Sequence, residues 1–264
     1  MALADFSRGA VKSRGCTNSD LTMTNKRFRT AILAVVASVS VACSTSIQSP
    51  PNGLPPIAVS ASETSSAPGV PVPVPEVVTL LDRLVIVPEL PQIPGYERSC
   101  SKGSACVFGP AWADIERAGC DTRNRVLREQ LSDVTFKPGT RDCKVLTGSL
   151  HDPYSGSDVA FDFRTPRAVE IDHVFALARA WDAGAASWSS ERRLQFANDM
   201  TNLLAVTRAQ NGAKSDSGPG DWMPADRDFA CPYVMVYLRA AAKYQLSITD
   251  DDRGAALVAC GAQN

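Results

Sequence analysis

Histidine is scarce in this chain: only His151 and His173 occur among its 264 residues. Eight cysteines are present, but no two form a CxxC pair, so the usual spacings of cysteine or cysteine–histidine zinc sites are absent. The net charge of −1 excludes a protein that binds nucleic acid through bulk positive charge, although a local basic groove could still bind it. No G-x-S-x-G motif occurs, which argues against a serine hydrolase. Few residues are therefore left to carry chemistry.

The apolar run near the N-terminus, residues 31–41, is too short for a comfortable membrane span. It follows the basic stretch NKRFR (residues 25–29) and leads to small residues before Cys43, which is typical of a secretory signal rather than of a buried core helix. Cys43 resembles the cysteine of a bacterial lipobox. We therefore expect residues 1–43 to be a signal that ends either in lipid attachment at Cys43 or in cleavage and release. Met23 is a more typical start, which would make the residues before it an upstream extension.

The cysteines predict disulfides. Cys16 and Cys43 lie in the processed region, which leaves six for the mature chain. An even set in an exported protein predicts three disulfides, although six cysteines permit fifteen pairings, and an oxidising compartment disfavours the alternative of free thiols. Spacing along the chain favours the pairs Cys100–Cys106, Cys120–Cys143 and Cys231–Cys260.

Residues 44–76 are rich in Pro, Ser, Val and Ala and carry almost no charge. Such a segment cannot bury enough apolar surface to offset the entropy of ordering, and its prolines favour an extended chain. We interpret it as a spacer, and we expect one folded domain over residues 77–264.

Hydrophobic spacing in this domain predicts an α+β fold, in which helices surround a small antiparallel sheet. The predicted disulfides would cross-link this domain. Residues 144–163 are expected to form a β-hairpin around the turn HDPYSG, because apolar residues alternate in the second half. Residues 168–174 and 203–206 are expected strands. Helices are expected over residues 109–120, 122–131, 176–184, 190–199, 208–214, 232–246 and 249–260.

Three of these helices carry explicit signals. Trp112, Ile115 and Ala118 recur at helical spacing in the segment 109–120. Asp121 is a favourable N-cap for the second helix, and Thr249 for the last one.

Five polar residues are expected to converge where the second pair of strands meets the short helix 208–214. One strand ends in Asp172 and His173, and the next is entered at Asn202. Asn211 and Lys214 lie three residues apart, on one face of the helix. If the strands pair and the helix packs over them, the five side chains form a site that suits hydrolysis of a phosphodiester.

The residue types suggest roles in this chemistry. A divalent cation, Mg²⁺ or alternatively Mn²⁺, would take the carboxylate of Asp172 and the amide oxygen of Asn211 and keep several waters. His173 would act as the general base on the attacking water. Asn202 would hold the other ring nitrogen and fix the tautomer. Lys214 would hold the phosphate as a point charge.

The segments that carry these residues are similar to a known family. EIDHVFALARAWDAGA, FANDMTNLLAV, NGAKSDSGPGDWMP and the upstream GCDTRNRVL resemble the His-Asn-His (HNH) nuclease superfamily with its ββα-metal (His-Me finger) core. More narrowly, they resemble a secreted branch related to the C-terminal domain of GmrSD-type restriction endonucleases. The resemblance extends over roughly residues 77–260 and implies metal-dependent cleavage of DNA. It implies His173 as the base, Asp172 and Asn211 as metal ligands and Asn202 as the orienting residue.

Other charged residues are further candidates for the site, with less support from the sequence. Glu170 shares a strand face with Asp172 and could support the metal ligands from behind. Arg123, Arg125 and Arg128 form either a patch that binds the phosphate backbone or a solvated helix face. We expect a monomer that acts on DNA with little sequence preference and contacts a membrane only through a possible lipid anchor at Cys43.

Two rival functions stay open. His151 and His173 could form a metal-free acid–base pair that cleaves RNA, although His151 is more typical of a turn residue. A nuclease-like fold that has lost activity could also serve as a binding module of the cell envelope.

Overall fold

A computed structural model describes residues 74–262 of the chain. The signal, Cys16, Cys43 and nearly all of the spacer lie outside these residues. The first helix begins at Val74, three residues before the expected start of the folded domain. Among the described helices, none is long and apolar enough to cross a membrane.

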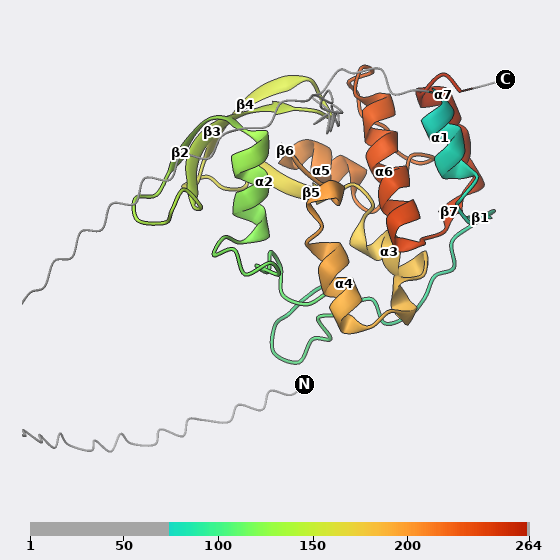
Figure 1. Cartoon of the computed structure of the whole chain (residues 1–264), viewed down its shortest axis with the longest axis horizontal. Coiled ribbons are helices and arrows are strands. Elements are labelled where there is room, and N and C mark those ends of the chain that lie inside the picture. The colour runs from blue at the N-terminus through green and yellow to red at the C-terminus, as the bar shows by residue number, and fades with distance from the viewer. Residues whose placement is uncertain (1–73, 263–264) are drawn as a thin grey trace, which may run out of the picture. The chain divides into compact units, whose positions relative to one another are not determined.

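The fold is mixed α and β, as predicted, with two small antiparallel sheets (Figure 1). The helices are α1 (Val74–Leu81), α2 (Thr122–Gln130), α3 (Leu177–Asp182), α4 (Ser190–Ala197), α5 (Arg208–Lys214), α6 (Ala230–Tyr244) and α7 (Asp250–Ala259), with 3₁₀ turns η1 (Ala185–Ser187) and η2 (Met200–Asn202). The strands are β1 (Ile86–Val87), β2 (Ser132–Phe136), β3 (Val145–Asp152), β4 (Ser157–Asp162), β5 (Val169–His173), β6 (Leu203–Thr207) and β7 (Ile248–Thr249).

The strands form three separate sheets. β2, β3 and β4 make an antiparallel sheet that includes the predicted hairpin, β5 and β6 form an antiparallel pair, and β1 pairs with β7 in parallel. In Figure 1, the β5–β6 pair lies between the three-stranded sheet and α6. Its register places Asp172 opposite Leu204 and His173 opposite Leu203. The two residues expected to carry chemistry are thus at the end of a short, well-paired strand.

Two hydrophobic cores hold this central pair from opposite sides. One core contains Val126 and Leu127 of α2 together with Ile171 of β5. The other core is built around α6. It includes Phe175, which follows β5, and Val206, which lies in β6. β5 is thus packed into the first core, and the chain that follows it enters the second.

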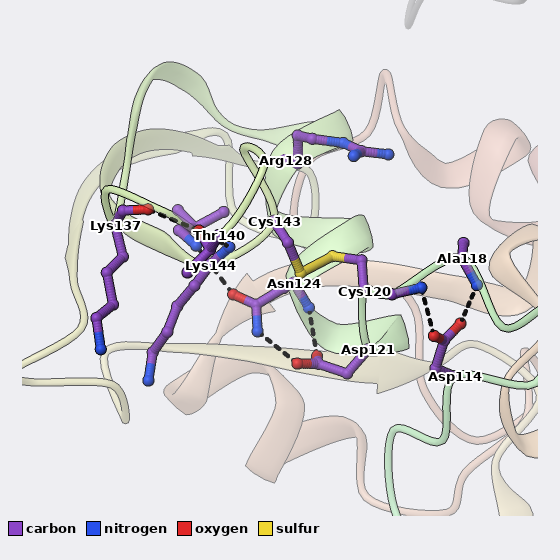
Figure 2. Close-up of a disulfide and its surroundings, with 12 residues drawn as sticks. Asp114, Ala118, Cys120, Asp121, Asn124, Arg128, Lys137, Thr140, Cys143 and Lys144 are labelled. Carbon is purple, nitrogen blue, oxygen red and sulfur yellow. Dashed lines mark hydrogen bonds between the residues drawn. A yellow bond between two sulfur atoms is a disulfide. The ribbon is translucent and has the colours of Figure 1, made fainter. Parts of the chain in front are cut away.

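The N-terminus of α2 is capped as predicted. The side chain of Asp121 accepts a hydrogen bond from the backbone N–H of Asn124 at 2.9 Å and another from its side-chain amide at 2.7 Å. The oxygen of the same Asn124 amide accepts from the backbone of Val145 at 3.0 Å, and the close-up in Figure 2 shows Asn124 next to Asp121. This cap therefore connects α2 to strand β3 and also stabilises the start of the helix.

The helix predicted over residues 109–120 does not form, and the prediction was wrong. The segment is a series of turns, in which Trp112 and Arg117 take left-handed backbone angles (φ +58° and +55°). The carboxylate of Asp114 accepts hydrogen bonds from the backbone of Ala118 and Gly119, at 2.9 and 2.7 Å, and so offers these N–H groups an alternative to a helix. Trp112 therefore leaves the expected helical stripe and is available for another role.

All three predicted disulfides are present: Cys100–Cys106, Cys120–Cys143 and Cys231–Cys260. Cys120 precedes the cap of α2, and Cys143 precedes β3 (Figure 2), so this bond fastens the turn segment 109–120 to the three-stranded sheet.

Replacing both Cys120 and Cys143 with serine is expected to lower the free energy of unfolding by about 3 kcal/mol, because the bond closes a loop with a sequence separation of 23. Urea unfolding followed by circular dichroism measures the loss. The matched double variant at Cys100 and Cys106, with a separation of only 6, should lose about 1 kcal/mol less. A larger loss for this short loop would contradict the loop-entropy argument.

Candidate functional site

The site is built where β5, β6 and α5 meet. These three elements follow one another in the chain as strand, strand and helix, and α5 packs against both strands. Thr207 ends β6 and caps α5, since its hydroxyl accepts from the backbone of Gln210 and also donates to the buried carboxylate of Asp152 at 2.7 Å. The cap thus sets the angle at which α5 leaves the strands and carries Asn211 and Lys214 to β5.

His173 is held as a neutral imidazole with one nitrogen unused. Its Nε2 lies 2.8 Å from the carbonyl oxygen of Ala197. A carbonyl only accepts, so this nitrogen carries the proton, and Nδ1 keeps its lone pair. Among the described residues, no hydrogen bond reaches Nδ1. Burial, helped by the charges of Arg98 and Lys214, lowers the pKa of His173 to about 3, so the imidazole is in its basic form at neutral pH.

The indole of Trp112 covers one face of this imidazole. The two rings are nearly parallel, at 14°, with their centroids 5.8 Å apart, and His173 is only 6 % exposed. The left-handed backbone of Trp112 is uncommon for a bulky residue and marks a conformation that the surrounding structure imposes. Trp112 thus restricts how the His173 ring can turn. No pattern in the sequence indicates this contact, apart from the presence of the tryptophan.

Asp172 accepts two buried hydrogen bonds. Its Oδ1 lies 3.0 Å from the Nζ of Lys214, and its Oδ2 accepts from the Tyr154 hydroxyl at 2.6 Å. Burial, followed by the charge of Asp172, raises the pKa of Tyr154 well above its usual value, so the hydroxyl keeps its proton and acts as a donor. Tyr154 comes from the turn after β3, and no sequence pattern connects it to Asp172.

Lys214 does not take the position predicted for it. We expected a contact with phosphate, but the side chain is 0 % exposed, and its ammonium also donates to the carbonyl oxygen of His173 at 3.0 Å. A buried ammonium satisfied by these groups has no surface to offer a substrate. Its effect is to neutralise Asp172 and to hold the end of β5 in place.

Asn202 also has a different partner from the predicted one. It does not contact the His173 ring, whose nitrogen is bonded to Ala197. Its amide instead accepts from the backbone N–H of Phe175 at 2.8 Å and donates to the Phe175 carbonyl at 3.1 Å. Because Asn202 is fully buried, these bonds fix the chain two residues after His173 and position the imidazole indirectly.

Asn202→Ala is expected to leave the backbone N–H and C=O of Phe175 buried without partners, at a cost of about 1–3 kcal/mol for each group. The nearby Asn198→Ala is the matched control, since Asn198 is also buried but makes one hydrogen bond with its side chain. Urea titration of both variants measures the difference. Equal losses of unfolding free energy in the two variants would show that the two hydrogen bonds of Asn202 to Phe175 add no particular stability.

Glu170 and Asn211 form the second polar group of the site. The Asn211 side-chain amide donates to the Glu170 carboxylate at 2.7 Å, while the Arg208 guanidinium lies 3.9 Å from the other carboxylate oxygen. This contact orients the Asn211 amide and leaves its oxygen as an acceptor that no described residue fills. Glu170 thus contacts Asn211, one of the two residues expected to bind the metal, from the supporting position suggested by the sequence.

A cavity of about 500 Å³ brings these residues together. One wall comes from β5 and α5 and contains four of the predicted site residues. The opposite wall contains residues that we did not single out as part of a site. The lining includes Glu170, Asp172, His173 and Asn211 on the first wall, and Tyr96, Arg98, Trp112, Arg123 and Asp216 around it.

The predicted basic patch on α2 is split. Arg123 lines the cavity and donates to the carbonyl oxygen of Val169 at 3.0 Å. Arg125 instead pairs with Glu116 at 3.0 Å. Arg128 lies on the exposed side of α2, and Figure 2 shows it turned away from Lys137 and Lys144. Only Arg123 is therefore placed to contact a molecule in the cavity.

His151 lies apart from this site. It is on β3 and is not among the residues that line the cavity with His173. Its Nδ1 is 2.8 Å from the carboxylate of Asp158, and its side chain is 66 % exposed. The arrangement does not favour a pair of cooperating histidines.

The donor groups of the cavity suit a hard cation. Within residues 74–262, no group of three or more His, Cys, Asp or Glu side chains has the geometry of a complete metal site. Mg²⁺, however, is often held by one or two protein oxygens and completes its shell with water and substrate. The unfilled oxygen of Asn211 and the carboxylates of Asp172 and Glu170 line one cavity and fit this kind of site.

Comparison with known proteins identifies the family of this chain. The model of the GmrSD restriction endonucleases, C-terminal domain, matches residues 121–259, which include every residue of β5, β6 and α5. A protein of Arthroderma benhamiae, described as an uncharacterized secreted protein, is 34 % identical over 208 residues. The alignment covers 75 % of this chain and 94 % of that protein. No solved structure matches the chain.

The chain thus belongs to the GmrSD C-terminal domain family, as the sequence motifs indicated. The secreted relative and the three disulfides are consistent with an extracellular location. Residues 74–120, which provide Tyr96, Arg98 and Trp112, lie before the matched segment.

Proposed function

We propose that this protein is a secreted, metal-dependent endonuclease that hydrolyses phosphodiester bonds in DNA, with His173 as the general base. The observation that carries the proposal is the state of His173 in the cavity. It is a neutral imidazole whose Nε2 is occupied by a carbonyl and whose Nδ1 is unused, next to oxygen donors for a cation. Membership of a family described as restriction endonucleases supports the same reaction.

His173 would remove a proton from the attacking water through Nδ1. The bond from Nε2 to Ala197 fixes the tautomer that this step needs, and the stacked Trp112 limits rotation of the ring. The bond from Nε2 to the Ala197 carbonyl favours the protonated ring, whereas burial and the charges of Arg98 and Lys214 oppose it. The reacting phosphate would lie in the cavity next to the wall formed by β5 and α5, which carries His173.

Asp172 and Asn211 would hold one divalent ion, Mg²⁺ or Mn²⁺, with Glu170 orienting Asn211. Such an ion would act as a Lewis acid toward the phosphate and its leaving oxygen. Lys214 and Tyr154 keep the Asp172 carboxylate in one orientation, since each donates to a different oxygen. The two residues would therefore position the ligand rather than contact the substrate.

The proposal is tested by incubating the purified, disulfide-bonded protein with native and heat-denatured plasmid DNA in Mg²⁺ or Mn²⁺. DNA of either form should be cleaved, EDTA should stop the reaction, and added metal should restore it. Cleavage of RNA that persists in EDTA would favour the metal-free ribonuclease. An absence of cleavage with both metals would favour the inactive binding module.

The N-terminal part of the proposal concerns residues outside the described range. We expect Cys43 either to carry a lipid anchor or to be lost on cleavage and release of the signal. Mass spectrometry of the mature N-terminus distinguishes the two outcomes.

A further inference from the structure

The wall of the cavity that faces His173 is formed by residues that lie outside the segment matched by the family model. It comes from the loop segment 95–112, which precedes the matched residues 121–259. Three of its side chains, Tyr96, Arg98 and Trp112, line the cavity. They combine two aromatic rings and a cation, and the carboxylate of Asp216, whose charge acts on Tyr96, also lines the cavity.

This wall is rigid. The Cys100–Cys106 disulfide closes its loop, and the Glu97 carboxylate accepts from the backbone of Ala105 at 2.8 Å across the same loop. The ring of Tyr96 packs on two core aromatics, since its centroid lies 6.3 Å from those of both Phe108 and Trp181. Tyr96 nevertheless remains 36 % exposed. It is therefore fixed in place and still able to stack with a planar group.

Arg98 adds a cation at the same wall. It is exposed, and within residues 74–262 no carboxylate forms an ion pair with it. Arg123 lines the cavity from α2, so two guanidinium groups flank the space in front of His173. Guanidinium groups bind phosphate oxygens in a planar, bidentate manner.

The depth of the site limits the form of the substrate. His173 is 6 % exposed and lines a cavity of about 500 Å³, a volume within the range of ligand pockets. A DNA duplex is stiff over tens of base pairs and does not bend its phosphates one at a time into such a space. A single strand is flexible, and proteins bind it by stacking bases on aromatic rings and pairing its backbone with cations.

We infer that the preferred substrate is single-stranded DNA, held by Tyr96 and Arg98 on the wall that faces His173. This inference rests on the proposed nuclease function and names the form of DNA on which it acts. Tyr96 stacks with a base next to the scissile phosphate, and Arg98 pairs with a backbone phosphate.

The test compares three phosphodiester substrates with the wild-type protein. These are a single-stranded oligonucleotide, a covalently closed duplex of the same sequence, and bis(p-nitrophenyl) phosphate, which has no strand to hold. The single strand should be cleaved at least about tenfold faster than the closed duplex, since the stacking and phosphate contacts are available only to it.

Variants assign the effect to the wall. Arg98→Ala and Tyr96→Ala should each lower kcat/KM on the single strand by about tenfold more than they lower it on bis(p-nitrophenyl) phosphate. Lys102→Ala removes an exposed charge from the same disulfide loop outside the cavity lining, and Tyr96→Phe keeps the ring. Both controls should stay close to the wild type.

Equal rates on single strand and duplex would overturn the inference, as would a loss for Arg98→Ala no larger than that for Lys102→Ala. If bis(p-nitrophenyl) phosphate is hydrolysed in either case, the proposed nuclease chemistry stands and the substrate preference alone fails. If no phosphodiester is hydrolysed, the proposed function fails, and the inference fails with it.

Discussion

His173→Ala is expected to lower kcat for phosphodiester hydrolysis by about 10²- to 10⁴-fold, the usual contribution of a general base. The reason is local. The imidazole has a single free nitrogen in the cavity, and no other histidine lines that cavity to replace it. Initial rates with bis(p-nitrophenyl) phosphate in Mg²⁺ measure the loss without any contribution from strand binding.

His151→Ala is the matched control, because His151 is exposed, pairs with Asp158 and lies outside the cavity lining. Its rate should equal that of the wild type. A thermal unfolding curve for both variants shows whether the domain stays folded. If His151→Ala lost activity and folded His173→Ala kept it, the base would be misassigned.

Lys214→Met is expected to lower the free energy of unfolding by about 3–5 kcal/mol. Methionine approximates the length of the side chain but removes the ammonium, which leaves the Asp172 carboxylate buried beside an apolar group. It also removes the hydrogen bond to the His173 carbonyl. Urea unfolding of the purified variant gives the magnitude.

A double-mutant cycle separates the ion pair from other effects of the lysine. Asp172→Asn removes the charge but keeps an oxygen that can accept from Tyr154. The double variant should be more stable than the sum of the two single losses predicts, by about 1–3 kcal/mol, since it leaves no unpaired charge. Strict additivity would mean that Lys214 and Asp172 do not depend on one another.

Local signals in the sequence predicted much of this fold. Asp121 and Thr249 cap their helices because a short polar side chain can accept from the backbone three residues later, which needs no knowledge of the tertiary structure. The strand that ends in Asp172 and His173 was likewise visible as an apolar run. The disulfide pairs followed from short separations along the chain.

The segment 109–120 shows where local reasoning fails. The spacing of Trp112, Ile115 and Ala118 is helical, but the carboxylate of Asp114 and the Cys120–Cys143 bond hold the chain in turns. Ile115 and Ala118 are exposed as a result. Tertiary contacts thus overrode a weak helical pattern.

The site could be located from the sequence more easily than its contacts could be assigned. Asp172, His173 and Asn211 do share one cavity, because the order of strand, strand and helix brings them together. The partner of His173, however, is the backbone of Ala197, which has no side-chain signature. Lys214 and Asn202 are both buried and bond to other parts of the protein. This could not be predicted, because the residue type does not reveal whether a polar group faces the substrate or completes a buried network.

The joint placement of a cation and the His173 imidazole in one cavity is tested most directly by NMR with Mn²⁺. The chain has only two histidines, so selective labelling gives one set of ring signals from the site and one from the distant His151. A substoichiometric amount of Mn²⁺ should broaden the His173 signals through its unpaired electrons and leave those of His151 sharp. Signals of His173 that stay sharp, or equal broadening of both histidines, would contradict a metal site at Asp172 and Asn211.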